Sequence, residues 1–484
     1  MKQFDTEEIR KNLYHEKFRP QFHFSPPTGW HNDANGPVYY EGEYHLFYQH
    51  NPFDIVWGPM YWGHAVSKDL VHWQNLPIAL EPNELGTIFS GTIVVDWKDS
   101  SGFFDGGHGL VAIFTQHTDE REVQSIAFSR DKGRTWTLYE GNPVLQGDGS
   151  KEYKDYRDPR VFWHEGRQKW IMFLGGGLYR IYSSDNLREW TYESSPGIFE
   201  EFPDVMHLAV DGDPEKKKWV LVTAGYGYYV GDFDGYRYKA EQPYQTADFG
   251  KSWQAPYYFA NFPDPSRCVW IGWMRDASSA PTFPWRCNFS MPRDLALKTT
   301  PFGFVVTQWP SREIENLYDQ HFHFEDIVLK PGENPLAGIR SNTFDLEAEF
   351  SFEGDAEFGI EFLKGGEVRT TAKYVPHAQV AVSDVLRASD AQYEKMETCF
   401  RSAMYGNERI LAKSCEAYLP ASEKTMRIRI IADVSAVEIF FGDGEAVFSH
   451  SVYPPEHCKE LCAFASGEGV TLKRCDVYTI KSIW

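Results

Sequence analysis

Short apolar runs recur through the first 310 residues and are separated by polar turns. The five clearest runs cover residues 44–48, 110–114, 170–174, 219–223 and 269–273. Runs of this length that are rich in aromatic and β-branched residues suit buried β-strands better than helices. The turn pairs Glu41-Gly42 and Glu165-Gly166 precede two of the runs, as expected for hairpins. The pattern therefore predicts strands in this part of the chain.

A polar turn of similar composition recurs between these runs. It begins with Ser or Ala and ends in Trp, and the four copies contain Asp69, Asp131, Asp185 and Asp248. An Asp side chain can accept hydrogen bonds from the backbone N–H groups that follow it, which closes such a turn. The successive Asp residues are 62, 54 and 63 positions apart, and a multi-strand unit of that size is typical of a propeller blade. The repeat predicts about five blades over residues 20–310, in preference to a large sandwich with chance Asp turns.

The pattern changes after residue 310. Apolar and polar residues alternate at 344–350, 426–432 and 437–441, and a Gly-Asp-Gly turn follows at 442–444. Alternation with a period of two predicts antiparallel strands with one buried face, as in a β-sandwich. The N-terminal residues Asp5 and Glu8 have the spacing of a helix cap. We therefore predict an all-β protein: a five-bladed β-propeller with a short N-terminal helix in residues 1–320, followed by a β-sandwich in residues 321–484.

Composition and charge narrow the possible functions. The net charge of −21 disfavours binding to nucleic acid or to an anionic membrane surface and favours neutral substrates. Aromatic residues make up 16% of the chain and can stack on sugar rings. The seven Cys residues lack the spacing of a metal site. The N-terminus lacks the apolar segment of a signal peptide, so we expect a cytoplasmic protein as the chain stands, or a secreted one if a leader has been removed.

Three carboxyl groups stand out as candidates for catalysis. They are Asp33, Asp158 and Glu201, and each opens a predicted blade, one blade after another, with a Pro shortly beyond it. Because the innermost strands of successive blades converge on one axis, side chains at equivalent positions can meet there. Cleavage of a glycosidic bond needs two carboxyl groups, one ionised and one that carries a proton. Each residue alone has an ordinary explanation in a turn or on the surface, but together they suggest a glycosidase.

The motifs around these residues resemble glycoside hydrolase family 32, which contains invertases, levanases and inulinases. The resemblance extends over nearly the whole chain. It is carried by His-Phe-Ser-Pro-Pro at 23–27, Asn-Asp-Ala-Asn-Gly at 32–36, Trp-Gly-Pro-Met-Tyr-Trp-Gly-His-Ala at 57–65, Phe-Ser-Gly at 89–91, Arg-Asp-Pro at 157–159, Pro-Trp-Arg at 284–286 and Ala-Asp-Val-Ser-Ala-Val-Glu-Ile-Phe at 432–440. It implies a five-bladed propeller joined to a β-sandwich, and a retaining β-fructofuranosidase.

The resemblance also implies roles for individual residues. Asp33 would be the nucleophile, Asp158 the stabiliser of the transition state and Glu201 the general acid and base. The implied sugar contacts are Asn32, Gln49, Trp57, Phe89, Ser90, Arg157 and Trp285. The expected substrates are terminal fructosyl units of sucrose, fructo-oligosaccharides, levan or inulin, and no metal or cofactor is implied. A fructosyltransferase and a catalytically silent fructan-binding protein remain as alternatives, and the sequence does not indicate an oligomeric state.

The neighbouring residues suggest how each carboxyl group is tuned. Donors from Asn32 and the turn would favour the anion of Asp33, and Arg157 would keep Asp158 charged. The neighbours expected to raise the pKa of Glu201 are Phe199, Glu200, Phe202 and Pro203.

The sequence departs from the family pattern at three positions. His31 and Ala34 replace the usual Met and Pro beside the nucleophile, and Phe202 replaces the usual Cys after the acid. His31 is expected to be either a packed aromatic residue or a polar contact to the substrate.

Overall fold

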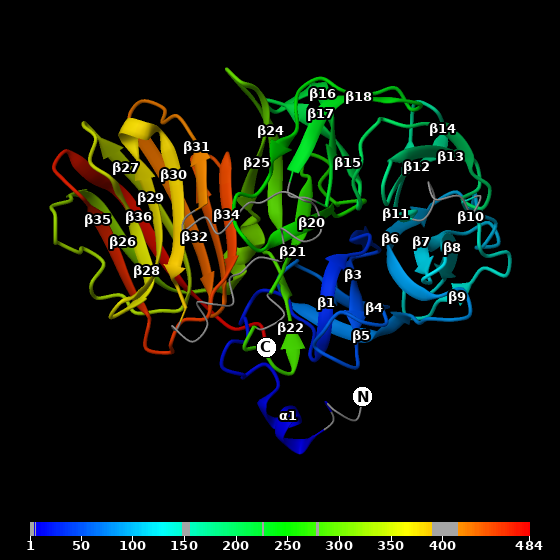
Figure 1. Cartoon of the computed structure of the whole chain (residues 1–484), viewed down its shortest axis with the longest axis horizontal. Coiled ribbons are helices and arrows are strands. Elements are labelled where there is room, and N and C mark those ends of the chain that lie inside the picture. Colours follow the sequence, from blue (N-terminus) through cyan, green and yellow to red (C-terminus); the bar gives the residue numbers. More distant parts are fainter. Residues whose placement is uncertain (1–3, 5, 148–154, 225–226, 277–279, 390–414) are drawn as a thin grey trace.

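The computed structural model describes residue 4 and residues 6–147, 155–224, 227–276, 280–389 and 415–484. Two β-rich parts lie side by side, with the N-terminal half of the chain on the right of Figure 1 and the C-terminal part on the left. The short helix α1 (Glu7–Asn12) precedes them. Its cap is Thr6, whose hydroxyl accepts a hydrogen bond from the backbone N–H of Ile9. The predicted cap Asp5 lies outside the described residues.

The N-terminal part is a five-bladed propeller, as the sequence predicts. The first blade contains β1 (Gly29–Ala34), β2 (Val38–Tyr40), β3 (Glu43–Asn51), β4 (Tyr61–Ser67) and β5 (Trp73–Leu80). The second contains β6 (Thr87–Asp96), β7 (Gly109–His117), β8 (Glu122–Ser129), β9 (Thr137–Leu138) and β10 (Leu145–Gln146). The third contains β11 (Arg157–His164), β12 (Lys169–Gly175), β13 (Arg180–Ser184) and β14 (Thr191–Ser194).

The last two blades are joined into one continuous sheet. The fourth contains β15 (Asp204–Val210), β16 (Asp213–Val222), β17 (Gly227–Phe233), β18 (Tyr238–Ala240) and β19 (Gln245–Thr246). The fifth contains β20 (Trp253–Tyr258), β21 (Val269–Met274), β23 (Asn288–Phe289), β24 (Arg293–Thr300) and β25 (Gly303–Pro310). A single parallel pair, Val210 with Leu297, links them. The short strand β22 (Trp285–Arg286) instead pairs in parallel with β1.

The five apolar runs of the sequence all occupy the same place in their blades. They form the second strands, β3, β7, β12, β16 and β21. These strands have neighbours on both sides within the sheet, and nearly all side chains of the five runs are buried. A strand in that position is apolar on both faces because each face packs against an adjacent blade. This explains why continuous apolar runs, rather than alternating ones, identify the blades.

The predicted Asp turns are correct at three of four places. Asp69 and Asp131 accept backbone hydrogen bonds inside the turns that follow β4 and β8. In the third blade the acceptor is Asn186 instead of Asp185, because Asn186 takes the third position of that turn. In the fourth copy Asp248 accepts a hydrogen bond from the backbone N–H of Gly250 inside the turn. Asp248 is fully buried and also accepts from the backbone N–H of Ser449 in the C-terminal part.

The C-terminal part is a sandwich of two antiparallel sheets. One sheet contains β26 (Tyr318–Val328), β36 (Val470–Ile480), β27 (Thr343–Phe352), β32 (Thr425–Asp433), β33 (Ala436–Phe441) and β34 (Ala446–Ser451). The other contains β31 (Cys415–Tyr418), β30 (Val380–Arg387), β29 (Val368–Val375), β28 (Phe358–Gly365) and β35 (Glu460–Ala465). The alternating residues Phe344, Leu346, Ala348 and Phe350 are fully buried between the sheets.

The connection between the two parts is short. The 3-10 helix η2 (Arg312–Leu317) follows β25, and β26 begins at Tyr318. The predicted boundary at 320/321 therefore falls inside β26, because the sandwich sheet already pairs Tyr318 with Ile480. A second 3-10 helix, η3 (Pro376–Ala378), connects β29 and β30.

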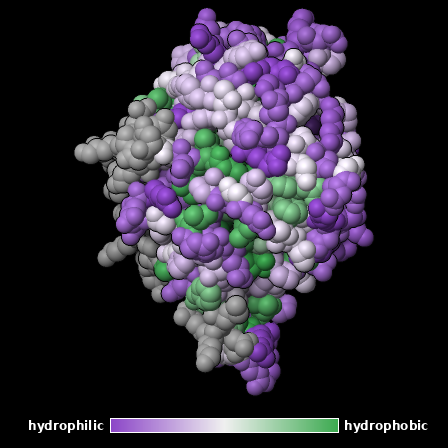
Figure 2. Space-filling view, turned by 90° about the vertical axis from the view of Figure 1, so that its right-hand side faces the viewer, coloured by the Kyte–Doolittle hydropathy of each residue, from purple (hydrophilic) through white to green (hydrophobic). Residues whose placement is uncertain are grey.

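The propeller end of the molecule is largely hydrophilic, with a small hydrophobic area near its centre (Figure 2). Among the described residues, no helix is long and apolar enough to cross a membrane. The six Cys residues that the structure describes are free thiols, and Cys399 lies outside the described residues.

Candidate active site

The predicted site residues lie where the innermost strands are irregular. The pairing register shifts in β1 between residues 31 and 34, in β6 between 88 and 91, and in β11 between 157 and 160. These intervals contain Asn32, Asp33, Phe89, Ser90 and Asp158. A bulge rotates a side chain out of the regular alternation of a strand and is common beside active sites. The three bulges therefore explain how strand residues turn toward a common site.

Two residues at the site have left-handed backbone conformations. Asp158 has φ of 62° and Phe202 has φ of 56°, a region that residues other than glycine seldom adopt. The two are linked, because the backbone N–H of Phe202 donates to Oδ2 of Asp158 at 3.1 Å. Strained backbone held by such contacts is typical of functional sites.

The arrangement corrects two details of the sequence-based expectation. Asp33 lies within β1 instead of just before the first strand. The three carboxyl groups also do not come from consecutive blades: they belong to the first and third blades and to the entry of the fourth. The second blade lies between and contributes Ser90, whose hydroxyl donates to Oδ2 of Asp33 at 2.9 Å.

The structure brings the three carboxyl groups close enough to affect one another's charge. Burial raises the pKa of Asp33 to about 6, against the lowering effect of hydrogen bonds from Ser90 and Asn32, and the negative charge of Glu201 adds to the rise. The expectation that its donors would favour the anion is correct for the hydrogen bonds themselves, but the net pKa of Asp33 is raised. Burial outweighs the two hydrogen bonds because removing a carboxylate from water is costly.

Asp158 behaves in the same way. Its burial and the charge of Glu201 raise the pKa of Asp158 well above its ordinary value, and Arg157 opposes the rise without cancelling it. The expectation that Arg157 would keep Asp158 charged is wrong, because the net pKa of Asp158 is raised. Arg157 stabilises the charge of Asp158 only weakly, because its guanidinium donates its hydrogen bonds to Glu122, Glu201 and Asp155.

Arg157 connects the site to a residue that sequence reasoning missed. Its guanidinium donates to Glu122 at 2.8 Å and to Glu201 at 3.2 Å. Glu122 is buried and also accepts from the backbone N–H of Tyr156 at 2.6 Å and pairs with His117 at 3.0 Å. A Glu at the start of a strand is usually solvated, and the polar residues Glu122 and Gln124 of β8 gave no local signal of their burial.

The surroundings of Glu201 differ from the apolar pocket expected from its neighbours in sequence. Phe199 is 74% exposed, and the ring of Phe202 turns into the core against Tyr257. Glu201 instead meets the guanidinium of Arg157. Burial raises the pKa of the adjacent Glu200 to about 7.

Aromatic side chains line the approach to the carboxyl groups. Trp57 is 57% exposed, and its ring meets the edge of Phe89 at 6.0 Å. Phe89 stacks on His117 at 4.2 Å and lies 5.8 Å from the guanidinium carbon of Arg157. An exposed indole beside a polar cluster is a surface on which a sugar ring can stack.

The two predicted amide contacts are held in place by the protein. The side-chain carbonyl of Asn32 accepts a hydrogen bond from the indole N–H of Trp30 at 2.9 Å. The amide of Gln49 donates to the backbone carbonyl of Ile88 at 3.0 Å. Both side chains are buried beside the β1 and β6 bulges, so they form the wall of the site.

For Trp285, the described contacts are with residues outside the group of three carboxyls, so its predicted sugar contact stays a prediction. Trp285 is 2% exposed, and the guanidinium carbon of Arg19 lies 3.9 Å from the centre of its ring. His31 is also fully buried, 4.7 Å from the ring of Phe289 and 5.8 Å from that of Tyr48. It is therefore a packed aromatic residue, the first of the two alternatives for this position.

Comparisons with known proteins agree with this architecture. Residues 23–310 match the N-terminal domain of glycosyl hydrolases family 32, and residues 313–479 match the family's C-terminal domain. A levanase of Bacillus subtilis (strain 168) is 40% identical over 99% of this chain and 73% of its own length. An extracellular exo-inulinase of Aspergillus niger is 31% identical over 97% of this chain and 96% of its own length.

Solved structures show the same two-part fold. The crystal structure of exo-inulinase from Aspergillus awamori has a TM-score of 0.86 at 29% identity and covers 97% of this chain and 100% of its own. A fructofuranosidase from Schwanniomyces occidentalis complexed with fructose has a TM-score of 0.84 at 26% identity, over 97% of this chain and 99% of its own. The propeller, the sandwich and the family match over both parts lead to one conclusion: the chain belongs to glycosyl hydrolase family 32 and is a glycoside hydrolase.

Proposed function

We propose that the protein is a retaining β-fructofuranosidase that releases terminal non-reducing fructosyl units from sucrose and fructans such as levan and inulin. The observation that carries the proposal is the convergence of Asp33, Asp158 and Glu201 from the inner edges of three blades, with mutual effects on their charge. Two carboxyl groups that flank a glycosidic bond are the minimal equipment for this chemistry. The names of the similar proteins, levanase and exo-inulinase, support the substrate class.

In this proposal each carboxyl group has a separate task. Asp33 attacks the anomeric carbon and forms a covalent fructosyl-enzyme, while Glu201 protonates the departing oxygen and later activates water. Asp158 stabilises the positive charge that develops on the sugar. Arg157, held by Glu122, positions Glu201. Trp57 at the entrance provides a stacking surface for the substrate.

The proposal is tested by incubating the purified protein with sucrose, inulin and levan and identifying the products. Release of single fructose units supports an exo-acting fructosidase, and absence of hydrolysis of all three substrates refutes it. Proton NMR of the first product distinguishes the stereochemistry. A retaining enzyme first releases β-fructofuranose, because two successive displacements at the anomeric carbon restore its configuration. The two carboxyl groups of such an enzyme lie about 5–5.5 Å apart, instead of the roughly 6.5–9.5 Å of inverting enzymes.

A fructosyltransferase is the second candidate, because a sugar hydroxyl can replace water on the same fructosyl-enzyme. The exposed Trp57 favours this possibility, since an exposed indole can hold an acceptor sugar as well as a leaving group. Product analysis at high sucrose concentration separates the two activities. A hydrolase gives glucose and fructose in equal amounts, whereas a transferase gives excess glucose and longer oligosaccharides.

A further inference from the structure

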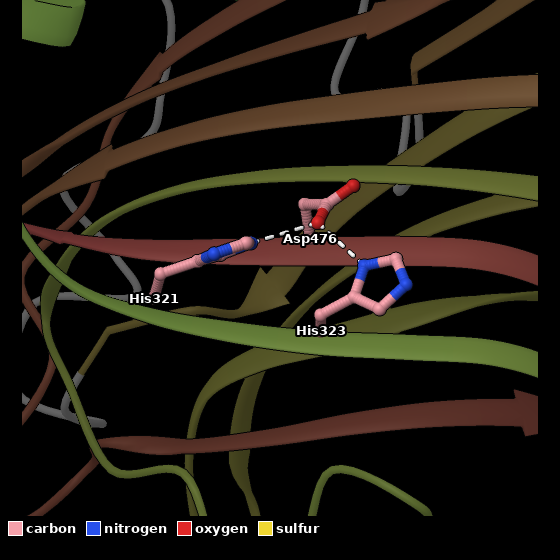
Figure 3. Close-up of side chains that lie close together, drawn as sticks. All are labelled: His321, His323 and Asp476. Carbon is pink, nitrogen blue, oxygen red and sulfur yellow. Dashed lines mark hydrogen bonds and ion pairs between the residues drawn. The ribbon is translucent and has the colours of Figure 1, made fainter.

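We propose that His321, His323 and Asp476 form a binding site for a divalent transition-metal ion on the outer surface of the sandwich. The two His residues lie two positions apart on the edge strand β26, so their side chains share one face. The neighbouring strand β36 places Asp476 directly opposite His323 and Tyr478 opposite His321. Figure 3 shows both rings directed toward the carboxylate.

The ligand atoms converge on one point. Nε2 of His321 and Nδ1 of His323 each lie 2.8 Å from the same oxygen, Oδ1 of Asp476. The three side chains offer ligand atoms that all lie within 4.8 Å of one another. Metal–ligand bonds of about 2.1 Å in a tetrahedron separate ligand atoms by about 3.4 Å. Small rotations of the three side chains would therefore admit an ion between them.

The surrounding residues hold the ligands in position. Arg474 donates to the second oxygen of Asp476, which leaves Oδ1 to face the two rings. The ring of His321 stacks on Tyr478 at 4.3 Å with an interplanar angle of 7°. Partners that orient ligands in this way strengthen metal sites. Asp476 is buried, but the His side chains are 45% and 46% exposed, so an ion can enter from solvent.

The chemistry of the ligands identifies the class of ion. Two imidazoles and one carboxylate suit Zn²⁺, Ni²⁺ and Cu²⁺, and solvent can occupy the remaining positions. The carboxylate must be charged and the rings neutral to bind. Glu347, opposite Asp476 on β27, adds negative charge nearby.

Such an ion would cross-link the two neighbouring strands β26 and β36. β26 is the first strand of the sandwich and lies at the edge of its sheet, where β36 is its neighbour within that sheet. A ligand set shared between these two strands would resist fraying of the edge. Since the ion binds the folded sheet and not the unfolded chain, it would raise the thermal stability of the whole protein. The inference is independent of the sugar-cleaving site.

The experiment uses the full-length protein after removal of metal with a chelator and exchange into metal-free buffer. Calorimetric titration with ZnCl₂ is expected to show one saturable site and a higher melting temperature. His321→Gln and His323→Gln are each expected to weaken Zn²⁺ binding by at least about 10-fold. With CuCl₂, the electron paramagnetic resonance spectrum is expected to show two coordinated imidazole nitrogens in the native protein and one in either variant.

The matched control is His72→Gln. His72 is also exposed and also pairs with a carboxylate, Asp69, at 2.8 Å, but it has no second His in the described contacts of that pair. This variant is expected to bind Zn²⁺ like the native protein. Without metal, His321→Gln and His323→Gln should have the same melting temperature and the same rate of sucrose hydrolysis as the native protein. These two measurements show that both variants fold. Absence of saturable binding, or binding that persists unchanged in His321→Gln and His323→Gln, would overturn the proposal.

Discussion

Individual side chains at the site are governed by their burial more than by their sequence neighbours. The pKa values of Asp33 and Asp158 both lie above their ordinary values, because the innermost strands remove both groups from water. Two negative charges in one small site oppose each other, so substrate binding and proton sharing decide which group is ionised. Burial therefore raises the pKa of the proposed nucleophile, Asp33, to about 6.

Replacement of Asp33 by Asn tests its assignment as nucleophile. The amide keeps the shape of the side chain but cannot form the covalent intermediate, so we expect hydrolysis of sucrose to fall by at least about 10³-fold. Circular dichroism and the melting temperature should remain near native values. Turnover within a few-fold of the native rate in a pure sample would show that another residue attacks the sugar.

Removal of the Ser90 hydroxyl should change the pH dependence of activity. The hydrogen bond from Ser90 lowers the pKa of Asp33, so Ser90→Ala raises that pKa further above about 6. Because the nucleophile must be ionised, the acidic limb of kcat/KM is expected to move to higher pH. The control Ser266→Ala removes a similar hydrogen bond to Asp264 on an exposed loop and should leave the limb in place. Equal profiles for both variants would contradict the role of Ser90.

The role of Glu201 can be separated from that of Asp33 through the leaving group. Sucrose needs protonation of the departing oxygen, and general acid catalysis typically contributes about 10²–10⁴-fold. Glu201→Ala should therefore slow sucrose cleavage severely but spare the first step with β-fructofuranosyl fluoride. Added azide should then accelerate turnover of the fluoride and give β-fructosyl azide. Equal losses on both substrates, with no effect of azide, would point instead to Glu200 or Asp204.

At the scale of the strand, irregular pairing turns side chains toward the site that regular alternation would direct elsewhere. The bulges in β1, β6 and β11 interrupt alternation where the site residues lie. Pro159, just after Asp158, lies inside the β11 bulge, where the missing backbone N–H does not break the ladder.

The close approach of the innermost strands sets strict limits on side-chain size. Gly36, just after β1, has φ of 56° and lies against the backbone of Thr92 and Ile93 in β6.

Gly36→Ala should therefore destabilise the propeller. A Cβ atom would overlap the β6 backbone and would also require a left-handed conformation, so we expect a loss of roughly 2–4 kcal/mol. The control Gly42→Ala has a similar φ of 87° but open space around the added atom, and it should cost about 1 kcal/mol. Melting temperatures measured by calorimetry compare the two. A smaller decrease in melting temperature for Gly36→Ala than for Gly42→Ala would show that the β6 backbone moves to accommodate the added Cβ atom.

On the scale of the whole molecule, the propeller and the sandwich share a buried charged interface. His23, which precedes the first blade, bonds Asp433 and Glu438 of the sandwich at 2.9 Å each. Glu438 also accepts from the Nε of Arg293 in the fifth blade at 2.7 Å. All four side chains are fully buried. Breaking such a network leaves an unpaired charge in the interior, so the two parts are expected to unfold together.

The interface predicts a pH-dependent stability. Burial alone would lower the pKa of His23, but its hydrogen bonds to Asp433 and Glu438 raise that pKa to about 9. A raised pKa in the folded state stabilises the protein below the unfolded value of 6.5, and this stability is lost as the pH rises through about 9. The native protein should therefore exceed His23→Gln in melting temperature most strongly below pH 6.5. A difference that stays constant from below 6.5 to above 9 would contradict a charged His23.

Local sequence is enough to specify the strands, the two-part architecture and the family, because apolar runs, alternation and turn residues act over a few positions. The runs at β3, β7, β12, β16 and β21 and the alternation of β27 show this directly. Contacts between residues far apart in the chain decide which side chains join the site and how the carboxyl groups are protonated. Glu122 became part of the site through Arg157, and Arg19 covers Trp285. The protonation of Asp33 and Asp158 follows from burial and from Glu201, because dielectric and charge depend on what the fold places nearby.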